Sequence, residues 1–138
     1  QRGFLGIKVA VGTVMLNLFS LHLSVFEEER ILSSKALLRI TSHINKSERI
    51  IIAGDFNVGV NKIGNHRYTF SQKDSYEEYE ILKKRFQHIG NTDPTWFSKD
   101  GNGCIDSCFY SNNLKLVKFE TIPTDVSDHY PIYMEFVI

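Results

Sequence analysis

The residues of this chain that could carry chemistry are a small set of carboxylates, histidines and one carboxamide, each at or beside the end of an expected strand. They are His22, Asp55, Asn57, Asp106, Asp128 and His129. Aspartate oxygens are hard ligands that suit Mg²⁺ or Mn²⁺, and these ions often keep several waters and bridge to phosphate. Nearby histidines can move protons or stabilise the charge that develops on phosphorus. The set therefore points to hydrolysis of a phosphodiester.

Asp55 and Asn57 follow an uninterrupted apolar run, 50–53, which predicts a strand buried on both faces. Gly54 lets the chain leave the sheet edge at little steric cost. The two polar residues then lie where a buried strand opens to solvent, the usual place for chemistry in a layered α/β protein. The local sequence is equally consistent with ordinary turn residues, which these types often are.

Asp106 lies in an otherwise apolar expected strand, 104–110, on the same face as Cys104 and Cys108. A buried carboxylate is costly unless it is paired, so Asp106 needs a cation or a histidine as its partner. The two cysteines would lie about 13 Å apart on one strand, too far for a disulfide. With no further ligand nearby they are a poor zinc signal, and we expect buried structural thiols.

His22 and Arg30 each have a more ordinary interpretation. A single histidine at the apolar end of a strand, here 14–23, is more often a core or edge residue than a catalytic group. Arg30 could reach toward an anion, although a solvated helix residue is the default for its position.

The order of elements predicts a mixed sheet with helices packed on it, an α/β protein. Strands 6–11 and 14–23 form a hairpin around Gly12-Thr13. Capping boxes at Ser24–Glu27 and Ser75–Glu78 predict helices that run to about residues 45 and 88. Further strands are expected at 50–54, 104–110, 114–122 and 132–138.

A polar loop, 58–74, separates the strand at 50–54 from the second helix. Its basic residues Lys62, His66 and Arg67 are interleaved with aromatics, a combination that can contact phosphate and stack on a base or sugar. An ordinary exposed loop with a few anchoring aromatics is at least as consistent with the sequence.

Size and charge narrow the class of protein. At 138 residues and 42% hydrophobic, the chain can bury one core, as one domain or part of one. Its 16 basic and 16 acidic residues cancel, which argues against a strongly basic nucleic-acid module. No apolar stretch is long enough to span a bilayer. The first residues lack a signal-peptide pattern, which says little for a chain that starts with Gln1.

The motifs in their order resemble the C-terminal half of the endonuclease/exonuclease/phosphatase superfamily, which includes deoxyribonucleases, abasic-site endonucleases, sphingomyelinases, inositol-polyphosphate 5-phosphatases and deadenylases. The resemblance rests on Leu21-His22-Leu23 with Arg30 in the next helix, Gly54-Asp55-Phe56-Asn57, Thr95-Trp96 leading to Ile105-Asp106, and Ser127-Asp128-His129-Tyr130-Pro131. Gly-Asp-Phe-Asn alone would be a weak signal. With Ser-Asp-His-x-Pro about 70 residues later and Ile-Asp between them, the signal is strong.

The resemblance implies a role for each matching position. Asp55 would orient or deprotonate the attacking water and share the metal with Asp128. Asp106 would pair with His129 and hold its tautomer, so that His129 acts as general base or stabilises the transition state. His22 would contact the scissile phosphate and could act as an acid.

Asn57 and Arg30 would bind phosphate oxygens, and the metal, Mg²⁺ or Mn²⁺, would neutralise charge. Two departures from the family are visible, Ser107 where an aromatic is common and Cys104 near a position that is often basic. Both weaken an assignment to the DNA-repair branch.

The resemblance also implies that residues 1–138 are the C-terminal portion of a domain about twice as long, and so half of a four-layer α/β sandwich with mixed sheets and outer helices. The first half of that domain supplies an Asn and a Glu to the metal site, and no stretch before His22 can do so. We therefore expect that the N-terminal half, or another chain, is needed as a partner.

Three hypotheses follow. The first is metal-dependent hydrolysis of a phosphodiester or phosphomonoester, nuclease-type with nucleic acid as a possible substrate, or alternatively of a phospholipid or inositol phosphate. The second is a non-catalytic fragment or interaction module that exposes a sheet face and edge strands. The least favoured is a coincidence of motifs in an unrelated α/β protein.

Overall fold

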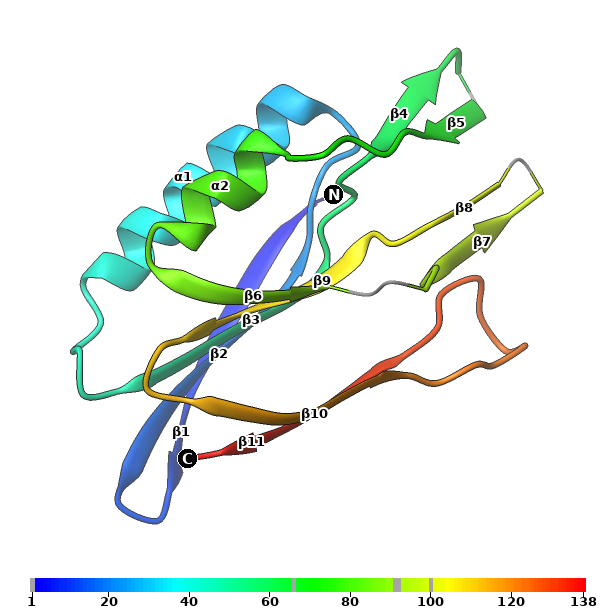
Figure 1. The fold of residues 1–138 in the computed structure, drawn as a ribbon. Coiled ribbons are helices and arrows are strands. Elements are labelled where there is room, and N and C mark those ends of the chain that lie inside the picture. The colour runs from blue at the N-terminus through cyan, green and yellow to red at the C-terminus, as the bar shows by residue number, and fades with distance from the viewer. Residues whose placement is uncertain (1, 66, 91–92, 100) are drawn as a thin grey trace.

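The computed structural model describes residues 2–65, 67–90, 93–99 and 101–138 (Figure 1). Two helices and several short and long strands follow one another along the chain. In order they are β1 (Gly3–Val11), β2 (Val14–His22), α1 (Glu27–Ser42), β3 (Arg49–Asp55), β4 (Val60–Ile63), β5 (Arg67–Phe70), α2 (Glu77–Lys83), β6 (Phe86–Gly90), β7 (Trp96–Ser98), β8 (Gly101–Gly103), β9 (Asp106–Ser111), β10 (Lys115–Thr121) and β11 (Ile132–Val137).

The main sheet has five strands in the order β1-β2-β3-β9-β6. β2 and β3 are parallel, and α1 makes the crossover between them, whereas the other neighbours are antiparallel. This mixed sheet with helices on it confirms the predicted α/β class. Hairpins β4–β5 and β7–β8 project beyond the same end of the sheet (Figure 1).

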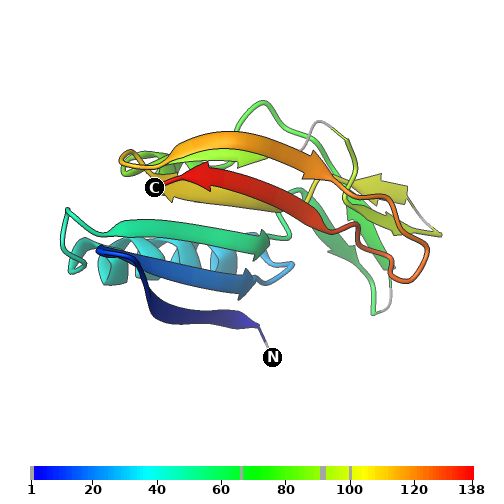
Figure 2. The ribbon, with the colours of Figure 1, turned by 90° about the horizontal axis from the view of Figure 1, so that it is seen from below.

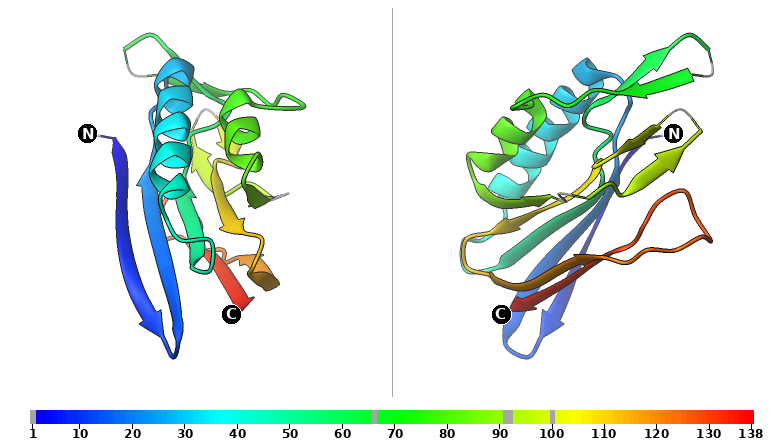
Figure 3. Two further views of the ribbon diagram at one scale, coloured as in Figure 1. Left: turned by 90° about the vertical axis from the view of Figure 1, so that its left-hand side faces the viewer. Right: turned by 45° about the vertical axis from the view of Figure 1, so that its right-hand side comes forward.

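The two faces of the sheet are covered differently. Helices α1 and α2 lie side by side on one face, and hairpin β10–β11 lies on the other (Figure 3). From below, the hairpin lies over β9 and β6 and leaves the β1–β2 side of the sheet uncovered (Figure 2). The rings of Tyr110 in β9 and Phe136 in β11 meet with centroids 5.2 Å apart, which holds the hairpin against the sheet.

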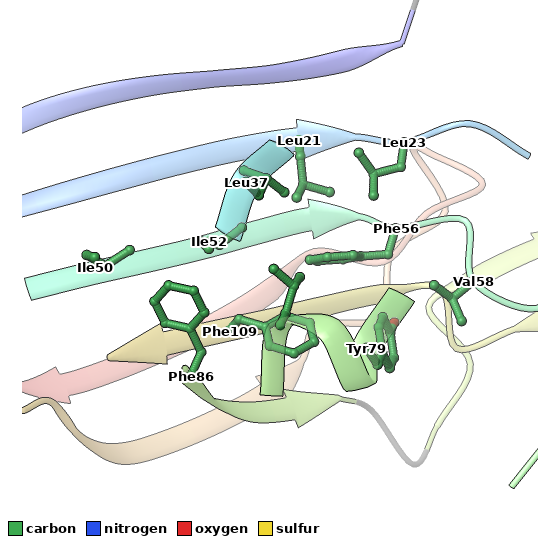
Figure 4. Close-up of a cluster of buried hydrophobic side chains, with 11 residues drawn as sticks. Leu21, Leu23, Leu37, Ile50, Ile52, Phe56, Val58, Tyr79, Phe86 and Phe109 are labelled. Atoms are coloured by element: carbon green, nitrogen blue, oxygen red, sulfur yellow. The ribbon is translucent and has the colours of Figure 1, made fainter. Parts of the chain in front are cut away.

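The core lies between the sheet and the helices (Figure 4). Ile50 and Ile52 of β3 are buried there, as are Leu37 of α1 and Phe109 of β9. Ile51 and Ala53 point to the other face and are only half-buried. The prediction that both faces of this strand are buried was therefore wrong in part, because hairpin β10–β11 covers only one side of that face.

Both predicted capping boxes were wrong. α1 begins after Phe26 and α2 after Tyr76, and neither helix has a side-chain cap. Ser24 Oγ instead accepts a hydrogen bond from the Phe26 amide at 3.2 Å, two residues on rather than three.

The helix ends also differ from the prediction. α1 ends at Ser42, and α2 is only seven residues long. Phe86, expected on a helical stripe with Tyr79 and Leu82, lies in β6, which pairs with β9. Phe86 is still buried in the same core. Its segment therefore pairs with β9 as a strand instead of extending the helix, and its side chain stays away from solvent.

The remaining expectations concern the loops and the cysteines. Loop 58–74 contains hairpin β4–β5, and 96–103 contains hairpin β7–β8. Cys104 and Cys108 are both free thiols, and Cys108 is buried as predicted, whereas Cys104 is only half-buried. Neither described helix is long and apolar enough to cross a membrane.

Candidate active site

The sheet register brings three of the predicted residues into one row. His22 ends β2, Asp55 ends β3 and Asp106 begins β9, and the pairing sets His22 beside Asp55 and Asp55 beside Asp106. Paired residues on adjacent strands point to the same face of a sheet. The three side chains therefore lie side by side at one end of the sheet, on the face away from the helices.

Gly54 allows β2 and β3 to approach closely enough for this row to form. Its φ is +140°, a conformation that side chains rarely adopt, and a Cβ there would lie 2.1 Å from the carbonyl oxygen of Leu21. Phe56, two residues on, is fully buried, and its ring contacts Phe109 with centroids 5.3 Å apart (Figure 4). Phe56 thus anchors the loop in the core while its neighbours Asp55 and Asn57 face the site.

Asn57 fixes the loop after β3 to the end of β2. It has a φ of 50°, a left-handed conformation that Asn tolerates better than most residues. Its amide nitrogen donates to Asp55 Oδ1 at 2.7 Å, and its Nδ2 donates to the Leu23 carbonyl at 2.8 Å. Nδ2 also lies 3.3 Å from Asp55 Oδ2, so both side-chain hydrogens are directed to protein oxygens. In this structure Asn57 binds protein groups where the resemblance implied phosphate.

Asp55 and His22 form a direct pair, with 3.1 Å between Asp55 Oδ2 and His22 Nε2. Burial raises the pKa of Asp55 to about 6, although the hydrogen bond from the Asn57 amide opposes this shift. Burial lowers the pKa of His22, and the positive charge of Arg2 lowers it further. At neutral pH the pair is therefore a neutral imidazole beside a largely ionised carboxylate.

Asp106 pairs with His129, the partner that the resemblance implied for it, with 3.0 Å between Asp106 Oδ2 and His129 Nδ1. This hydrogen bond raises the pKa of His129, against the opposing effect of burial. With the proton on Nδ1, Nε2 is left for the reaction, and Asp106 stabilises the imidazolium if Nε2 is also protonated.

Backbone contacts with β7 hold the segment that carries Asp128 and His129. The backbones of His129 and Trp96 form an isolated antiparallel β-bridge. The Phe97 amide donates to the Asp128 carbonyl at 2.8 Å, and the Tyr130 amide donates to the Thr95 carbonyl at 2.7 Å. This explains why Thr95-Trp96 and Ser127–Pro131, about 30 residues apart, act as one structural unit.

A cavity of about 380 Å³ opens over His22, Asp55, Asn57, Asp128 and His129. Arg2, Tyr68 and Trp96 also line it. Tyr68 belongs to the loop whose aromatics could stack on a base or sugar, whereas no role had been assigned to Arg2 or Trp96 from the sequence. A larger apolar groove of about 770 Å³, between β2–β3 and β11, meets the site at Asp106 and His129. The smaller cavity carries the polar groups, so we take it as the candidate active site.

The position of Arg2 could have been derived from the sequence. Hairpin β1–β2 turns at Gly12-Thr13, and counting back from this two-residue turn places Gly3 opposite His22, as observed. The residue before Gly3 must therefore lie beside the end of β2. Tyr68 and Trp96 reach the cavity from hairpins whose placement on the sheet has no local sequence signal.

Arg30 is not available to a phosphate. It is only 2% exposed, and its Nε lies 2.6 Å from Oε1 of the fully buried Glu78 in α2. Both the predicted phosphate contact and the default of a solvated residue were wrong, because Arg30 points between the two helices. Lys62 and Arg67 are exposed on hairpin β4–β5, and His66 lies outside the described residues.

Comparison with known proteins places the chain in a family. A model of the endonuclease/exonuclease/phosphatase family matches residues 9–129. The chain belongs to this family. A comparison with curated protein sequences gives no match.

Solved structures of similar fold confirm the architecture. One similar structure is that of D. rerio TDP2 complexed with a single-strand DNA product, which is 18% identical, with a TM-score of 0.73 over 99% of this chain and 62% of that one. Beta toxin from Staphylococcus aureus, in a structure with bound magnesium ions, is 17% identical, with a TM-score of 0.63 over 95% of this chain and 56% of that one. An endonuclease/exonuclease/phosphatase from Bacteroides vulgatus is 19% identical, with a TM-score of 0.65 over 92% of this chain and 51% of that one. The chain thus spans about half to three fifths of the length of these proteins.

The cavity offers part of a site for a divalent metal. Asp55 and Asp128 both line it, and Mg²⁺ is usually held by one or two carboxylates, several waters and substrate phosphate. Within the described part of the chain, no group of three or more acidic, histidine or cysteine side chains is arranged to hold a metal ion. The two carboxylates suit Mg²⁺ or Mn²⁺, with the remaining ligands to come from water, substrate or another polypeptide.

Proposed function

We propose that this chain carries the water-activating and phosphate-binding side of an active site that hydrolyses phosphodiesters with a divalent metal. The observation that carries the proposal is the row His22, Asp55 and Asp106 across three strands, closed by His129 on Asp106. Membership of the endonuclease/exonuclease/phosphatase family supports the reaction class.

In the proposed mechanism, Asp55 and the two histidines divide the proton transfers. Asp55, ionised at neutral pH, orients a water molecule and accepts its proton as the water oxygen attacks phosphorus. The phosphorus–oxygen bond to the leaving group breaks, and the leaving oxygen takes a proton from a solvent water molecule. His129, held by Asp106, donates from Nε2 to the phosphate and stabilises its developing charge, while His22 contacts the same phosphate from β2.

A divalent metal held by Asp128 and Asp55 would supply Lewis-acid stabilisation of the negative charge on phosphorus when bound. Arg2 lies at the same cavity and is always cationic, so it is placed to contact a phosphate oxygen as well. This arrangement replaces Arg30, which the fold buries elsewhere.

Nucleic acid is the substrate class that we favour. Tyr68 and Trp96 line the cavity from β5 and β7, where aromatic rings can stack on bases or sugars next to the reacting phosphate. Lys62 and Arg67 are exposed on the same hairpin as Tyr68, where they can follow a phosphate backbone. The structure of TDP2 with a single-strand DNA product supports this choice. A phospholipid or inositol phosphate is the second class.

Mg²⁺-dependent hydrolysis of a generic phosphodiester and of a single-stranded oligonucleotide tests the proposal, with Asp55→Ala as the inactive variant. Glu80→Ala is the matched control, because Glu80 is an exposed carboxylate on α2. We expect activity in the wild type and Glu80→Ala that is lost in Asp55→Ala. Equal activity of wild type and Asp55→Ala would overturn the assignment of the site.

A second candidate function is that of a fragment or interaction module that needs a complementary polypeptide. Leu5, Ile7, Val9 and Val11 of β1 are 70%, 55%, 38% and 46% exposed, on the face that carries the apolar groove. Since the similar structures are longer, the occupant that we propose is a polypeptide that supplies the remainder of this fold. A folded wild-type chain with no hydrolytic activity, which gains activity when that polypeptide is added, would support this alternative.

A further inference from the structure

Arg30 and Glu78 form an ion pair that is buried between α1 and α2, with side chains only 3% and 0% exposed. Burying both charges costs desolvation energy, which their attraction offsets only when the geometry is good and other hydrogen bonds are made. Apolar residues of similar volume would hold two helices together equally well. Packing of the two helices alone therefore gives no reason for an arginine at position 30.

The guanidinium binds backbone carbonyls of two separate loops. Nη1 donates to the Val25 carbonyl at 2.8 Å and lies 3.4 Å from the Ser24 carbonyl and 3.5 Å from the Val60 carbonyl. Ser24 and Val25 follow the end of β2, whereas Val60 begins β4. A lysine cannot reproduce this, because it lacks the planar fork that allows Arg to bind Glu78 and the carbonyls together.

These two loops are walls of the candidate active site. Val25 and Val60 line the same cavity as Asp55. The Val60 amide donates to the Asn57 carbonyl at 3.2 Å, and Asn57 Nδ2 donates to the Leu23 carbonyl at 2.8 Å. Arg30 therefore closes a ring of contacts that runs from the end of β2 through Asn57 to β4 and back.

We propose that Arg30, oriented by Glu78, is a positioning residue of the active site that fixes the end of β2 against the loop after β3. His22 and Asp55 come from these two segments, so the ring sets the geometry of their pair. This inference rests on the proposed function for its consequence in catalysis, but not for its structural content.

The charges of the pair must be removed together. Oε2 of Glu78 is buried and has no hydrogen-bond partner among the described residues, so loss of Arg30 alone would leave an uncompensated charge. The principal variant is therefore Arg30→Met combined with Glu78→Leu, which keeps volume between the helices and removes the donors to the loops. Arg30→Lys is the second variant, which keeps the charge and loses the fork.

The matched control is Leu37→Ala, in the same helix, since Leu37 is fully buried and does not line the cavity. The first readout is amide hydrogen exchange of Val60, together with the NMR shift of the Asn57 side-chain amide. We expect the exchange of Val60 to be about tenfold faster in both Arg30 variants than in a Leu37→Ala protein of equal global stability. The Asn57 amide signal should move in the Arg30 variants alone.

The second readout is the split between kcat and KM for phosphodiester hydrolysis, where we expect kcat to fall and KM to stay within about twofold. Unchanged exchange and shifts in both Arg30 variants, or equal changes in Leu37→Ala, would overturn the proposal. If the double variant does not fold, the hydrogen exchange of Val60 and the Asn57 side-chain shift in Arg30→Lys alone test the proposal. An inactive wild type would count against the proposed function only, because the NMR comparison needs no turnover.

Discussion

Asp55 and Asp106 are register partners on the adjacent strands β3 and β9, and each carboxylate contacts a different histidine. Burial is the main cause of the raised pKa of Asp55, and the negative charge of Asp106 raises it further. The charges of His129 and Arg2 act in the opposite direction and lower the pKa of Asp55. A cation bound at the cavity would lower it further, which connects the sheet register to metal-dependent chemistry.

Asp55→Asn should abolish hydrolysis and also stabilise the metal-free protein at neutral pH. The pKa of Asp55 in the folded protein is about 6, above its ordinary value of 3.8, so its contribution to stability is present at low pH and is lost as pH rises through about 6. We expect a gain of about 1 kcal/mol in the free energy of unfolding at pH 7 after allowance for solvent screening. Urea unfolding of the wild type and Asp55→Asn in the presence of a chelator measures this difference in the free energy of unfolding.

The pH dependence provides the control for this prediction. Wild-type protein should gain stability between pH 7 and pH 5 relative to Asp55→Asn, whose side chain does not titrate. A variant less stable than the wild type at pH 7 would show that the ionised carboxylate stabilises the fold, contrary to the effect of burial.

Asp106→Asn should lower the pKa of His129 and slow hydrolysis. The hydrogen bond that His129 donates to Asp106 is the main cause of the raised pKa of His129, and an amide cannot stabilise the imidazolium as a carboxylate does. NMR titration of His129 measures the shift, with the exposed His43 as an internal control that should not move. We expect activity to fall about 10- to 100-fold. An unchanged His129 titration would mean that the pair does not form in solution.

Mg²⁺ should raise the melting temperature of the wild type and not that of Asp128→Asn. A ligand at 100 times its dissociation constant stabilises a fold by about 2.7 kcal/mol, which is several degrees for a domain of this size. Asp125→Asn is the matched control, since Asp125 is an exposed carboxylate three residues earlier in the same segment. A thermal shift that persists in Asp128→Asn would place the metal elsewhere.

Much of the site could be predicted from the sequence because its residues are tied to local features. The apolar run before Gly54 marks where β3 ends, and Asp55 and Asn57 lie directly at that end. Asp106 is conspicuous as a carboxylate among apolar residues, and a cation or a histidine was expected as its partner. Strand ends and unpaired charges leave a signal in the sequence that depends on few distant contacts.

Arg30 and Phe86 had no such signal. The partner of Arg30 lies 48 residues away on another helix, so its position after β2 could not distinguish a buried ion pair from a phosphate contact. Phe86 continues the apolar stripe of α2, and only the pairing of β6 with β9 makes it part of a strand. The capping box expected at Ser24 lies in a segment whose Ser24 and Val25 carbonyls are contacted by the Arg30 guanidinium, a long-range contact that the local sequence does not reveal.

Gly54→Ala should unfold the protein or nearly so. A Cβ at this position would lie 2.1 Å from the Leu21 carbonyl, and the backbone φ of +140° is strained for any side chain. Because the obstacle is backbone rather than a flexible side chain, we expect a loss of more than about 3 kcal/mol. Gly12→Ala is the control, with a φ of +60° and open space around it, and it should cost only about 1 kcal/mol. Equal losses in the two variants would mean that close packing of β2 and β3 at Gly54 is not needed.

His88 should make the protein acid-sensitive. Its ring stacks on Phe109 and Tyr79 with centroids 4.5 and 4.7 Å away, and burial lowers its pKa to about 4. A lowered pKa means that its contribution to stability is complete above about pH 6.5 and is lost as pH falls toward 4. His88→Phe keeps the ring contacts and removes the titration. Between about pH 6.5 and 4, the free energy of unfolding should therefore fall by about 1–2 kcal/mol less in the variant than in the wild type. Asp55 acts in the opposite direction over the same range, but it is present in both proteins and cancels in the difference. Parallel pH profiles for wild type and His88→Phe would show that the imidazole is hydrated in the folded protein.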